Sequence, residues 1–223
     1  MITLMKPSYQ SVNILAFDTS GEVASVAVWA DKKICKASLP FGTGSHSQAS
    51  QLFSVIQGLL KDANTTFQDL NVIATIVGPG SFTGIRLGLA TAQGLILSTK
   101  ATSFAPTTLQ NYAFGAWREK ETSETVDSYL VTLTTKRNSF YTQAFRKNLE
   151  ALSPASIKTE DEINDILATH SGMCRVENLS LLSAETMIYF YFHTMENGKN
   201  LPHILRPYYL HDPEFVKQKP WSL

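Results

Sequence analysis

The turn Asp18-Thr19-Ser20-Gly21 holds the first polar side chains that could do chemistry. It follows a short apolar run that is typical of a strand. A carboxylate and two hydroxyls at the end of a strand could meet Mg²⁺ and phosphate. The same residues also suit a plain turn, in which Asp and Ser side chains bond to the local backbone. Both interpretations stay open for Asp18, Thr19 and Ser20.

The loop Gly78-Pro79-Gly80-Ser81-Phe82-Thr83-Gly84 joins a predicted strand to a predicted helix. Backbone N–H groups at the start of a helix can hold an anion. The loop lacks the Gly-Lys-Ser/Thr ending of a P-loop, so no lysine would reach the terminal phosphates of a nucleotide. Glycines also permit a tight turn and close packing of a helix on a sheet. The residues favour this second, structural role.

The histidines do not predict a metal site. His46 precedes a predicted helix, but Ser50 stands four residues later, so two imidazoles do not share a helix face. The other histidines show no metal-ligand spacing and no nucleophile signature such as Gly-x-Ser-x-Gly; they are His170, His193, His203 and His211. We therefore predict no bound metal and no catalytic residue.

The elements that would position these residues occur in two similar series. Hydrophobic periodicity and turn signals predict strands at 13–17, 23–30 and 34–39, a helix at 47–60, a strand at 72–77, a helix at 84–98, a strand at 102–104 and a helix at 106–117. The second half predicts a hairpin at 128–134 and 139–146, a helix at 159–169 with a capping box at Thr159 and Glu162, a strand at 173–177 and a helix at 183–195. This order predicts a mixed sheet with helices on its faces, formed twice.

The helices at 47–60 and 84–98 each carry a second face of small or uncharged residues beside an apolar stripe. Residues 42–60 contain no charged side chain, and residues 71–99 contain only Arg86. A helix that is apolar or small nearly all round is buried on more than one side. We therefore predict that these faces bind a partner protein. The predicted interface residues are Ser47, Ser50, Gln51, Ser54, Gly58, Gly84, Gly88, Thr91 and Leu95.

Composition limits the function classes. The chain has 223 residues, with 19 basic and 19 acidic side chains, so it lacks the positive charge of a stand-alone nucleic-acid binder. Nothing in the sequence is typical of a signal peptide or of a membrane-spanning segment. Cys35 and Cys174 lack Cys-x-x-Cys spacing and fit reduced thiols. We expect a cytoplasmic protein.

The sequence resembles the TsaB (YeaZ) family, the bacterial accessory proteins of tRNA threonylcarbamoyladenosine biosynthesis. The resemblance rests on Ile14-Leu-Ala-Phe-Asp-Thr-Ser, Ala24-Ser-Val-Ala-Val-Trp29, His46, Gly78-Pro-Gly-Ser-Phe-Thr-Gly-Ile-Arg-Leu-Gly88 and Ala92-Gln-Gly94. It is dense from residue 13 to about 117 and sparse afterwards, where Leu182-Ser-Ala-Glu185 and Pro207-Tyr-Tyr-Leu210 match.

The resemblance implies an α/β fold of the actin-like ATPase and sugar-kinase (ASKHA) type, with two ribonuclease-H-like lobes of mixed sheets flanked by helices. We place the lobes at 1–115 and 116–223, with the C-terminal tail packing back on the first. The implied protein is a non-catalytic scaffold that supports the catalytic subunit TsaD, together with the ATPase TsaE, in transferring threonylcarbamoyl to the adenosine beside the anticodon. A homodimer could use the same helices. Nucleotide and Mg²⁺ would bind only in the full complex, and tRNA only through it.

Two departures from the family pattern matter. Thr134, Lys136 and Ser139 stand where the family usually has Asp-Ala-Arg and then Glu, although Tyr141 is kept, and His211 replaces an arginine after the tail motif. Contacts that those side chains make in relatives therefore do not carry over. Two other functions remain alternatives: an active ATPase or kinase using Asp18, Thr19 and Ser20, and a glycoprotease-like metallopeptidase, which the missing second histidine disfavours.

Overall fold

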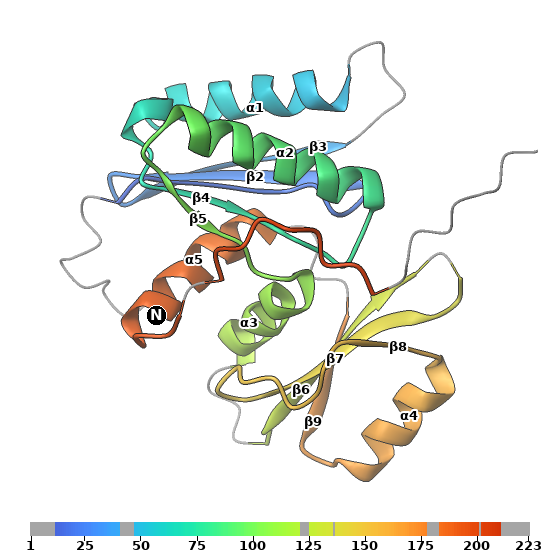
Figure 1. Ribbon diagram of the computed structural model, residues 1–223. Coiled ribbons are helices and arrows are strands. Elements are labelled where there is room, and N and C mark those ends of the chain that lie inside the picture. The colour runs from blue at the N-terminus through green and yellow to red at the C-terminus, as the bar shows by residue number, and fades with distance from the viewer. Residues whose placement is uncertain are drawn as a thin grey trace, which may run out of the picture.

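The first of two sheets contains five strands. The computed structural model describes residues 12–40, 47–120, 125–135, 137–177, 183–200 and 202–210 (Figure 1). The strand order is β3-β2-β1-β4-β5; β1, β2 and β3 form an antiparallel meander, and β4 and β5 run parallel to β1. The bounds are β1 Ile14–Asp18, β2 Val23–Ala30, β3 Lys33–Pro40, β4 Val72–Thr75 and β5 Thr102–Phe104.

Strand β1 is the centre of this sheet and is buried along its whole length. Leu15 and Phe17 point into one apolar cluster, whereas Ile14 and Ala16 point into another on the opposite face. A central strand covered on both faces is apolar throughout and does not alternate apolar with polar residues.

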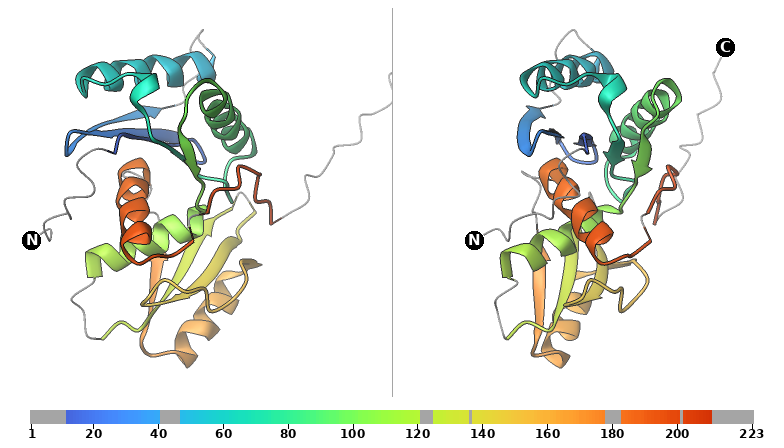
Figure 2. Two further views of the ribbon diagram at one scale, coloured as in Figure 1. Left: turned by 60° about the vertical axis from the view of Figure 1, so that its left-hand side comes forward. Right: turned by 90° about the vertical axis from the view of Figure 1, so that its left-hand side faces the viewer.

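Helices cover both faces of the first sheet. The helices α1 (Gln48–Asp62) and α2 (Phe82–Ser98) lie side by side on one face, and α5 (Ser183–Glu196) lies on the other (Figures 1 and 2). Ser47 caps α1 by accepting a hydrogen bond from the Ser50 N–H at 3.2 Å, and Ser81 caps α2 through the Gly84 N–H at 3.3 Å. The helices predicted at 47–60 and 84–98 are both confirmed.

The second sheet has the order β8-β7-β6-β9. Strands β6, β7 and β8 are antiparallel neighbours, and β9 is parallel to β6. The helix α3 (Thr108–Lys120) covers one face through Leu109, Tyr112, Ala113 and Ala116. The remaining elements are β6 Ser128–Thr134, β7 Phe140–Arg146, β8 Ser156–Lys158, α4 Glu160–Thr169, β9 Met173–Glu177 and a short 3-10 helix at Phe67–Asp69.

Local signals in the second half formed as expected. The Glu162 N–H donates to Thr159 Oγ1 at 3.4 Å, and the Thr159 N–H donates to Glu162 Oε2 at 2.8 Å. These two bonds form the predicted capping box at the start of α4. The cysteine-containing strands β3 and β9 lie in different sheets, and Cys35 and Cys174 form no disulfide.

Both sheets therefore place an antiparallel meander beside a strand that returns in parallel through a helix. This duplicated arrangement confirms the predicted α/β class, with mixed sheets flanked by helices. The helix α5 follows the second sheet in the chain but packs on the first, because Met187, Ile188 and Tyr191 join the cluster beneath β1 and β4. The lobe boundaries at 1–115 and 116–223 stay a prediction.

Candidate functional site

The carboxylate of Asp18 lies at the end of β1 and is 6% exposed. Its Oδ1 accepts a hydrogen bond from the Ser20 N–H at 2.8 Å. Its Oδ2 accepts a hydrogen bond from the hydroxyl of Ser183, the first residue of α5. The predicted turn contact is therefore present, and a helix from 165 residues further along the chain supplies the second partner.

Asn111 connects this carboxylate to α3. Its Nδ2 donates to the carbonyl oxygen and to the hydroxyl of Ser183, both at 3.0 Å. The three side chains of Asp18, Ser183 and Asn111 thus join β1, α5 and α3 in one buried network. Asn111 Oδ1 is buried and has no hydrogen-bond partner among the described residues.

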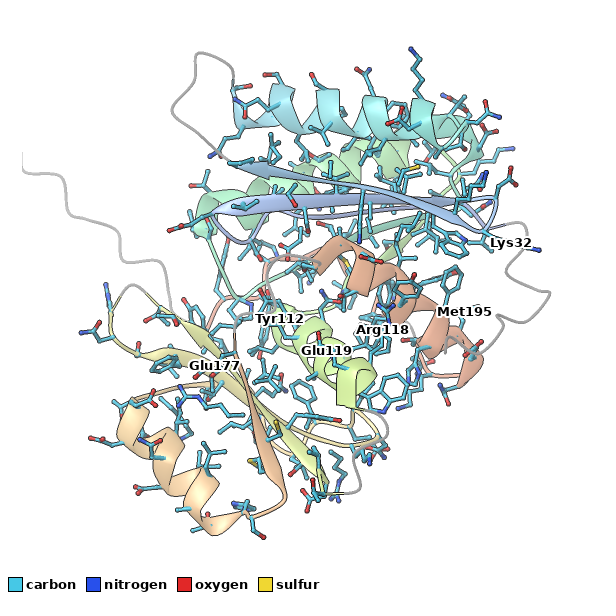
Figure 3. The ribbon with its side chains drawn as sticks, turned by 180° about the vertical axis from the view of Figure 1, so that it is seen from behind. Lys32, Tyr112, Arg118, Glu119, Glu177 and Met195 are labelled. Atoms are coloured by element: carbon cyan, nitrogen blue, oxygen red, sulfur yellow. The ribbon has the colours of Figure 1, made fainter. Side chains whose placement is uncertain are left out.

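Tyr112 lies next to this network, near the start of α3 and between the two sheets (Figure 3). Burial raises the pKa of its phenol well above the ordinary value, and the negative charge of Asp18 raises that pKa further. The phenol is thus kept neutral beside a carboxylate.

The glycine-rich loop packs against the end of β1. The Ser81 N–H donates to the Ser20 carbonyl at 2.7 Å, and Thr19 Oγ1 donates to the Gly84 carbonyl at 2.7 Å. Gly78 and Gly80 have φ angles of +114° and +157°, a region that favours glycine. A Cβ on Gly80 would lie 2.8 Å from the Ser20 carbonyl oxygen. The glycines therefore serve close packing, the structural role that the sequence favoured.

The predicted interface face of α2 is wrong. Gly84, Gly88, Thr91 and Leu95 are all buried within the chain. A Cβ on Gly84 would lie 1.8 Å from the Thr19 carbonyl oxygen, and one on Gly88 would lie 2.6 Å from Thr19 Oγ1. The small residues let α2 approach the sheet, so this stripe is not available to a partner.

The predicted face of α1 is accessible. Ser47, Ser50, Ser54 and Gly58 are exposed and Gln51 is half-buried. Nothing lies within 4 Å of a Cβ placed on Gly58. Whether this face binds a partner stays a prediction.

Helix α2 also has an exposed stripe, on a side that the sequence analysis did not single out. Ala90, Gly94 and Leu97 are exposed, and the Leu97 side chain is 89% exposed. On α1, Phe53 is 38% exposed next to Ser54. We call these six residues the outer helix surface: Phe53, Ser54 and Gly58 on α1, and Ala90, Gly94 and Leu97 on α2.

The segment 202–210 covers another side of α2. Its backbone is held by a hydrogen bond from the Tyr208 N–H to the Val77 carbonyl at 2.8 Å. Arg86 Nε donates to the Tyr209 hydroxyl at 3.1 Å, and the Tyr209 ring stacks on Phe82 with centroids 5.2 Å apart. The tail motif Pro207-Tyr-Tyr-Leu210 is recognisable in the sequence, but its contacts are not. The same is true of Ser183 and Asn111, because no local pattern marks a side chain whose partners are more than 70 residues away.

The departures in the second sheet lie in the β6–β7 hairpin. The hydroxyls of Thr135 and Ser139 are 2.7 Å apart, and the Thr135 N–H donates to the Ser139 carbonyl at 2.8 Å. The predictions on His46, Lys136 and His211 lie outside the described residues. Across the ranges that the structure describes, no three His, Cys, Asp or Glu side chains gather as metal ligands, and no helix is long and apolar enough to cross a membrane.

The structure thus defines an α/β protein with two mixed sheets flanked by helices and a buried polar network at the end of β1. The family model described as "tRNA N6-adenosine threonylcarbamoyltransferase" matches residues 43–198. The chain belongs to this family, and the relatives and the solved structure that it matches are TsaB and YeaZ proteins.

Two curated relatives are both named as TsaB proteins of tRNA threonylcarbamoyladenosine biosynthesis. The chain is 38% identical over 108 residues to the Escherichia coli (strain K12) "tRNA threonylcarbamoyladenosine biosynthesis protein TsaB", covering 48% of this chain and 46% of that protein. It is 40% identical over 106 residues to the TsaB of Buchnera aphidicola subsp. Schizaphis graminum, covering 48% and 49%. The chain thus spans about half the length of these curated relatives.

A solved structure agrees over a longer stretch. "YeaZ from Pseudomonas aeruginosa" superposes with a TM-score of 0.68 at 20% identity, covering 89% of this chain and all of that one. At this identity the superposition establishes the shared fold.

Proposed function

We propose that this protein is a non-catalytic subunit of the machinery that makes N6-threonylcarbamoyladenosine in tRNA, and that it supports TsaD, which carries out the transfer. The names of its relatives support the biosynthetic role. The observation that carries the non-catalytic assignment is the state of Asp18, whose two carboxylate oxygens accept hydrogen bonds from Ser20 and Ser183. Burial and these two hydrogen bonds leave the carboxylate less accessible to Mg²⁺ or to a phosphate-bound cation than an exposed, unpaired carboxylate would be.

The first test is nucleotide turnover by the purified protein. We expect no ATP hydrolysis and no tightly bound metal, because Asp18 is held within the chain and the glycine loop lacks a P-loop lysine. Phosphate release would be measured with and without Mg²⁺. Steady turnover that Asp18→Asn removes would instead assign an active ATPase or kinase.

The partner surface is the outer helix surface. It has no charged residue among its six members, and it presents a nearly fully exposed Leu97 beside small residues that permit close approach. Two adjacent helices could pair with two helices of a partner in a four-helix arrangement. We propose TsaD as this partner, with TsaE joining the assembly, and a homodimer through the same surface when TsaD is absent.

The second test measures binding to TsaD by calorimetry. Leu97→Lys and Ser54→Arg place an unpaired charge in the contact, and we expect each to cost about 3 kcal/mol, a loss of more than 100-fold in affinity. Leu152→Lys is the matched control, because Leu152 is 42% exposed and lies beyond β7, away from α1 and α2. Equal binding by parent, Leu97→Lys and Ser54→Arg would place the partner elsewhere.

We further propose that tRNA binds only through the complex, that ATP or ADP with Mg²⁺ binds only there, and that the protein works in the cytoplasm. The balance of 19 basic and 19 acidic residues supports the first point, because phosphate neutralisation supplies most non-specific affinity for nucleic acid. Filter binding of tRNA at physiological salt tests it, since sub-micromolar binding by the isolated chain would contradict the proposal.

A further inference from the structure

A pocket of about 370 Å³ lies between α3, α5 and the end of β7, and none of the residues Asp18, Asn111 and Ser183 lines it. Its walls come from α3, the C-terminal half of α5, the end of β7 with the turn that follows, and residues 199, 200 and 202–204. Figure 1 shows α3 and α5 side by side at this junction. Pockets of roughly 300–1,000 Å³ between structural units are the usual sites of small ligands.

The wall formed by residues 199, 200 and 202–204 is fixed in place. The Ala105 N–H donates to the Pro202 carbonyl at 2.6 Å, and Ser103 Oγ donates to the His203 carbonyl at 2.7 Å. The Lys199 N–H donates to the Thr194 carbonyl at 3.1 Å, which holds the segment to the end of α5. The pocket is therefore formed before any ligand arrives, which lowers the entropy cost of binding.

The floor of the pocket is apolar and partly aromatic. Ala113 and Phe145 are each 1% exposed, and Phe190 is half-buried. Phe190 is itself fixed, because its ring stacks on Phe114 with centroids 4.9 Å apart and 15° between the planes. A rigid aromatic wall of this kind favours a flat ring in the ligand.

The polar part of the pocket is basic. Lys199, His193 and His203 lie in its lining, and none of the described lining residues is acidic. Lys199 Nζ donates to the Asn148 carbonyl at 2.9 Å, which directs the ammonium toward the turn after β7. An ammonium has three N–H donors, so this bond leaves two for a ligand.

We propose that this pocket binds a small aromatic anion, with the ring against Phe190 and the anionic group at Lys199. The aromatic floor accounts for the ring, and the basic, acid-free rim accounts for the charge. The site is separate from the outer helix surface, so it does not depend on the function proposed above.

The probe is 8-anilinonaphthalene-1-sulfonate, whose fluorescence rises in apolar surroundings, titrated into the full chain. We expect saturable binding of one equivalent, and about tenfold weaker binding of the uncharged analogue N-phenyl-1-naphthylamine. Lys199→Glu and His203→Glu should each weaken sulfonate binding about tenfold, because each puts a negative charge in the lining. Both side chains are exposed, so the fold should survive, and circular dichroism checks this.

Two controls locate the probe. Lys100→Glu makes the same charge change beyond α2, and Leu97→Lys disrupts the outer helix surface. Both should bind the sulfonate as the parent does. Absence of saturable binding by the parent, parent-like binding by both glutamate variants of the pocket, or loss of the signal in Leu97→Lys would each overturn the proposal.

Discussion

Replacing Gly84 by alanine should damage the site, whereas the same replacement at Gly94 should not. Both glycines belong to α2, nearly three turns apart. A Cβ on Gly84 would lie 1.8 Å from the Thr19 carbonyl oxygen and 3.0 Å from the carbonyl carbon. A Cβ on Gly94 meets nothing within 4 Å. The pair therefore compares one chemical change in two environments.

The magnitude follows from the shift that Gly84→Ala requires. The Cβ and the oxygen must separate by about 1.6 Å to reach ordinary van der Waals contact. Such overpacking costs about 3 kcal/mol where the obstacle is backbone. The shift also weakens the hydrogen bond from Thr19 to the Gly84 carbonyl, worth about 1 kcal/mol, while alanine regains up to about 1 kcal/mol of helix propensity. We expect Gly84→Ala to lower the free energy of unfolding by about 3 kcal/mol, and Gly94→Ala to raise it by about 0.5–1 kcal/mol.

Urea unfolding followed by circular dichroism at equilibrium measures both values. The slope of the free energy against urea should stay the same in the three proteins, so that midpoints report stability alone. An unfolding free energy for Gly84→Ala within about 0.5 kcal/mol of the parent would refute the claim that this glycine exists for close packing. A loss in Gly94→Ala as large as that in Gly84→Ala would refute the assignment of the buried and exposed sides of α2.

Three further predictions concern single contacts. Ser183→Ala should lower the free energy of unfolding, measured by urea unfolding, by about 2 kcal/mol, because it removes a hydrogen-bond donor from the buried Asp18 carboxylate. The control Ser54→Ala, on the exposed side of α1, should change it by less than about 0.5 kcal/mol. The free energy of unfolding should fall as the pH rises above about 10, because the unfolded chain releases the Tyr112 proton near its ordinary pKa of 10.0 while the folded chain retains it. Tyr112→Phe should reduce this fall, which is measured as urea midpoints between pH 8 and 11. The hydrogen bond from Arg175 holds the pKa of Glu160 below its ordinary value of 4.5, so the pair stabilises the fold above that pH and loses its effect as the pH falls. Arg175→Gln should raise the Glu160 pKa toward 4.5 in an NMR titration. An unchanged pKa would contradict the assignment.

The sequence alone determined the elements and the fold class. Apolar periodicity located α1 and α2, and the Thr159 and Glu162 pair located the start of α4. These signals are local, because about a dozen neighbouring residues determine a helix face or a helix cap. The duplicated order of strands and helices, with the Gly-Pro-Gly-Ser-Phe-Thr-Gly motif, was enough to predict the α/β class and the family.

Only the tertiary structure decided which side of α2 is accessible. Gly84 and Gly88 form a small-residue stripe that would suit a partner or the chain's own sheet equally well in sequence. Helix periodicity fixes which residues share a face, but the rotation of the helix about its axis depends on what packs against it. Here the close approach of Thr19 settles that rotation, and it leaves Leu97 exposed.

The polar network at Asp18 was likewise beyond the sequence. Asp18, Asn111 and Ser183 are separated by 72 or more residues along the chain, and they meet because α5 returns from the second sheet to the first. The turn at Asp18 could be predicted from its own residues, since a carboxylate accepting the N–H two residues later is a local contact. The second partner of that carboxylate could not be, because a hydrogen bond between distant segments exists only once the packing of the helices and sheets has brought them together.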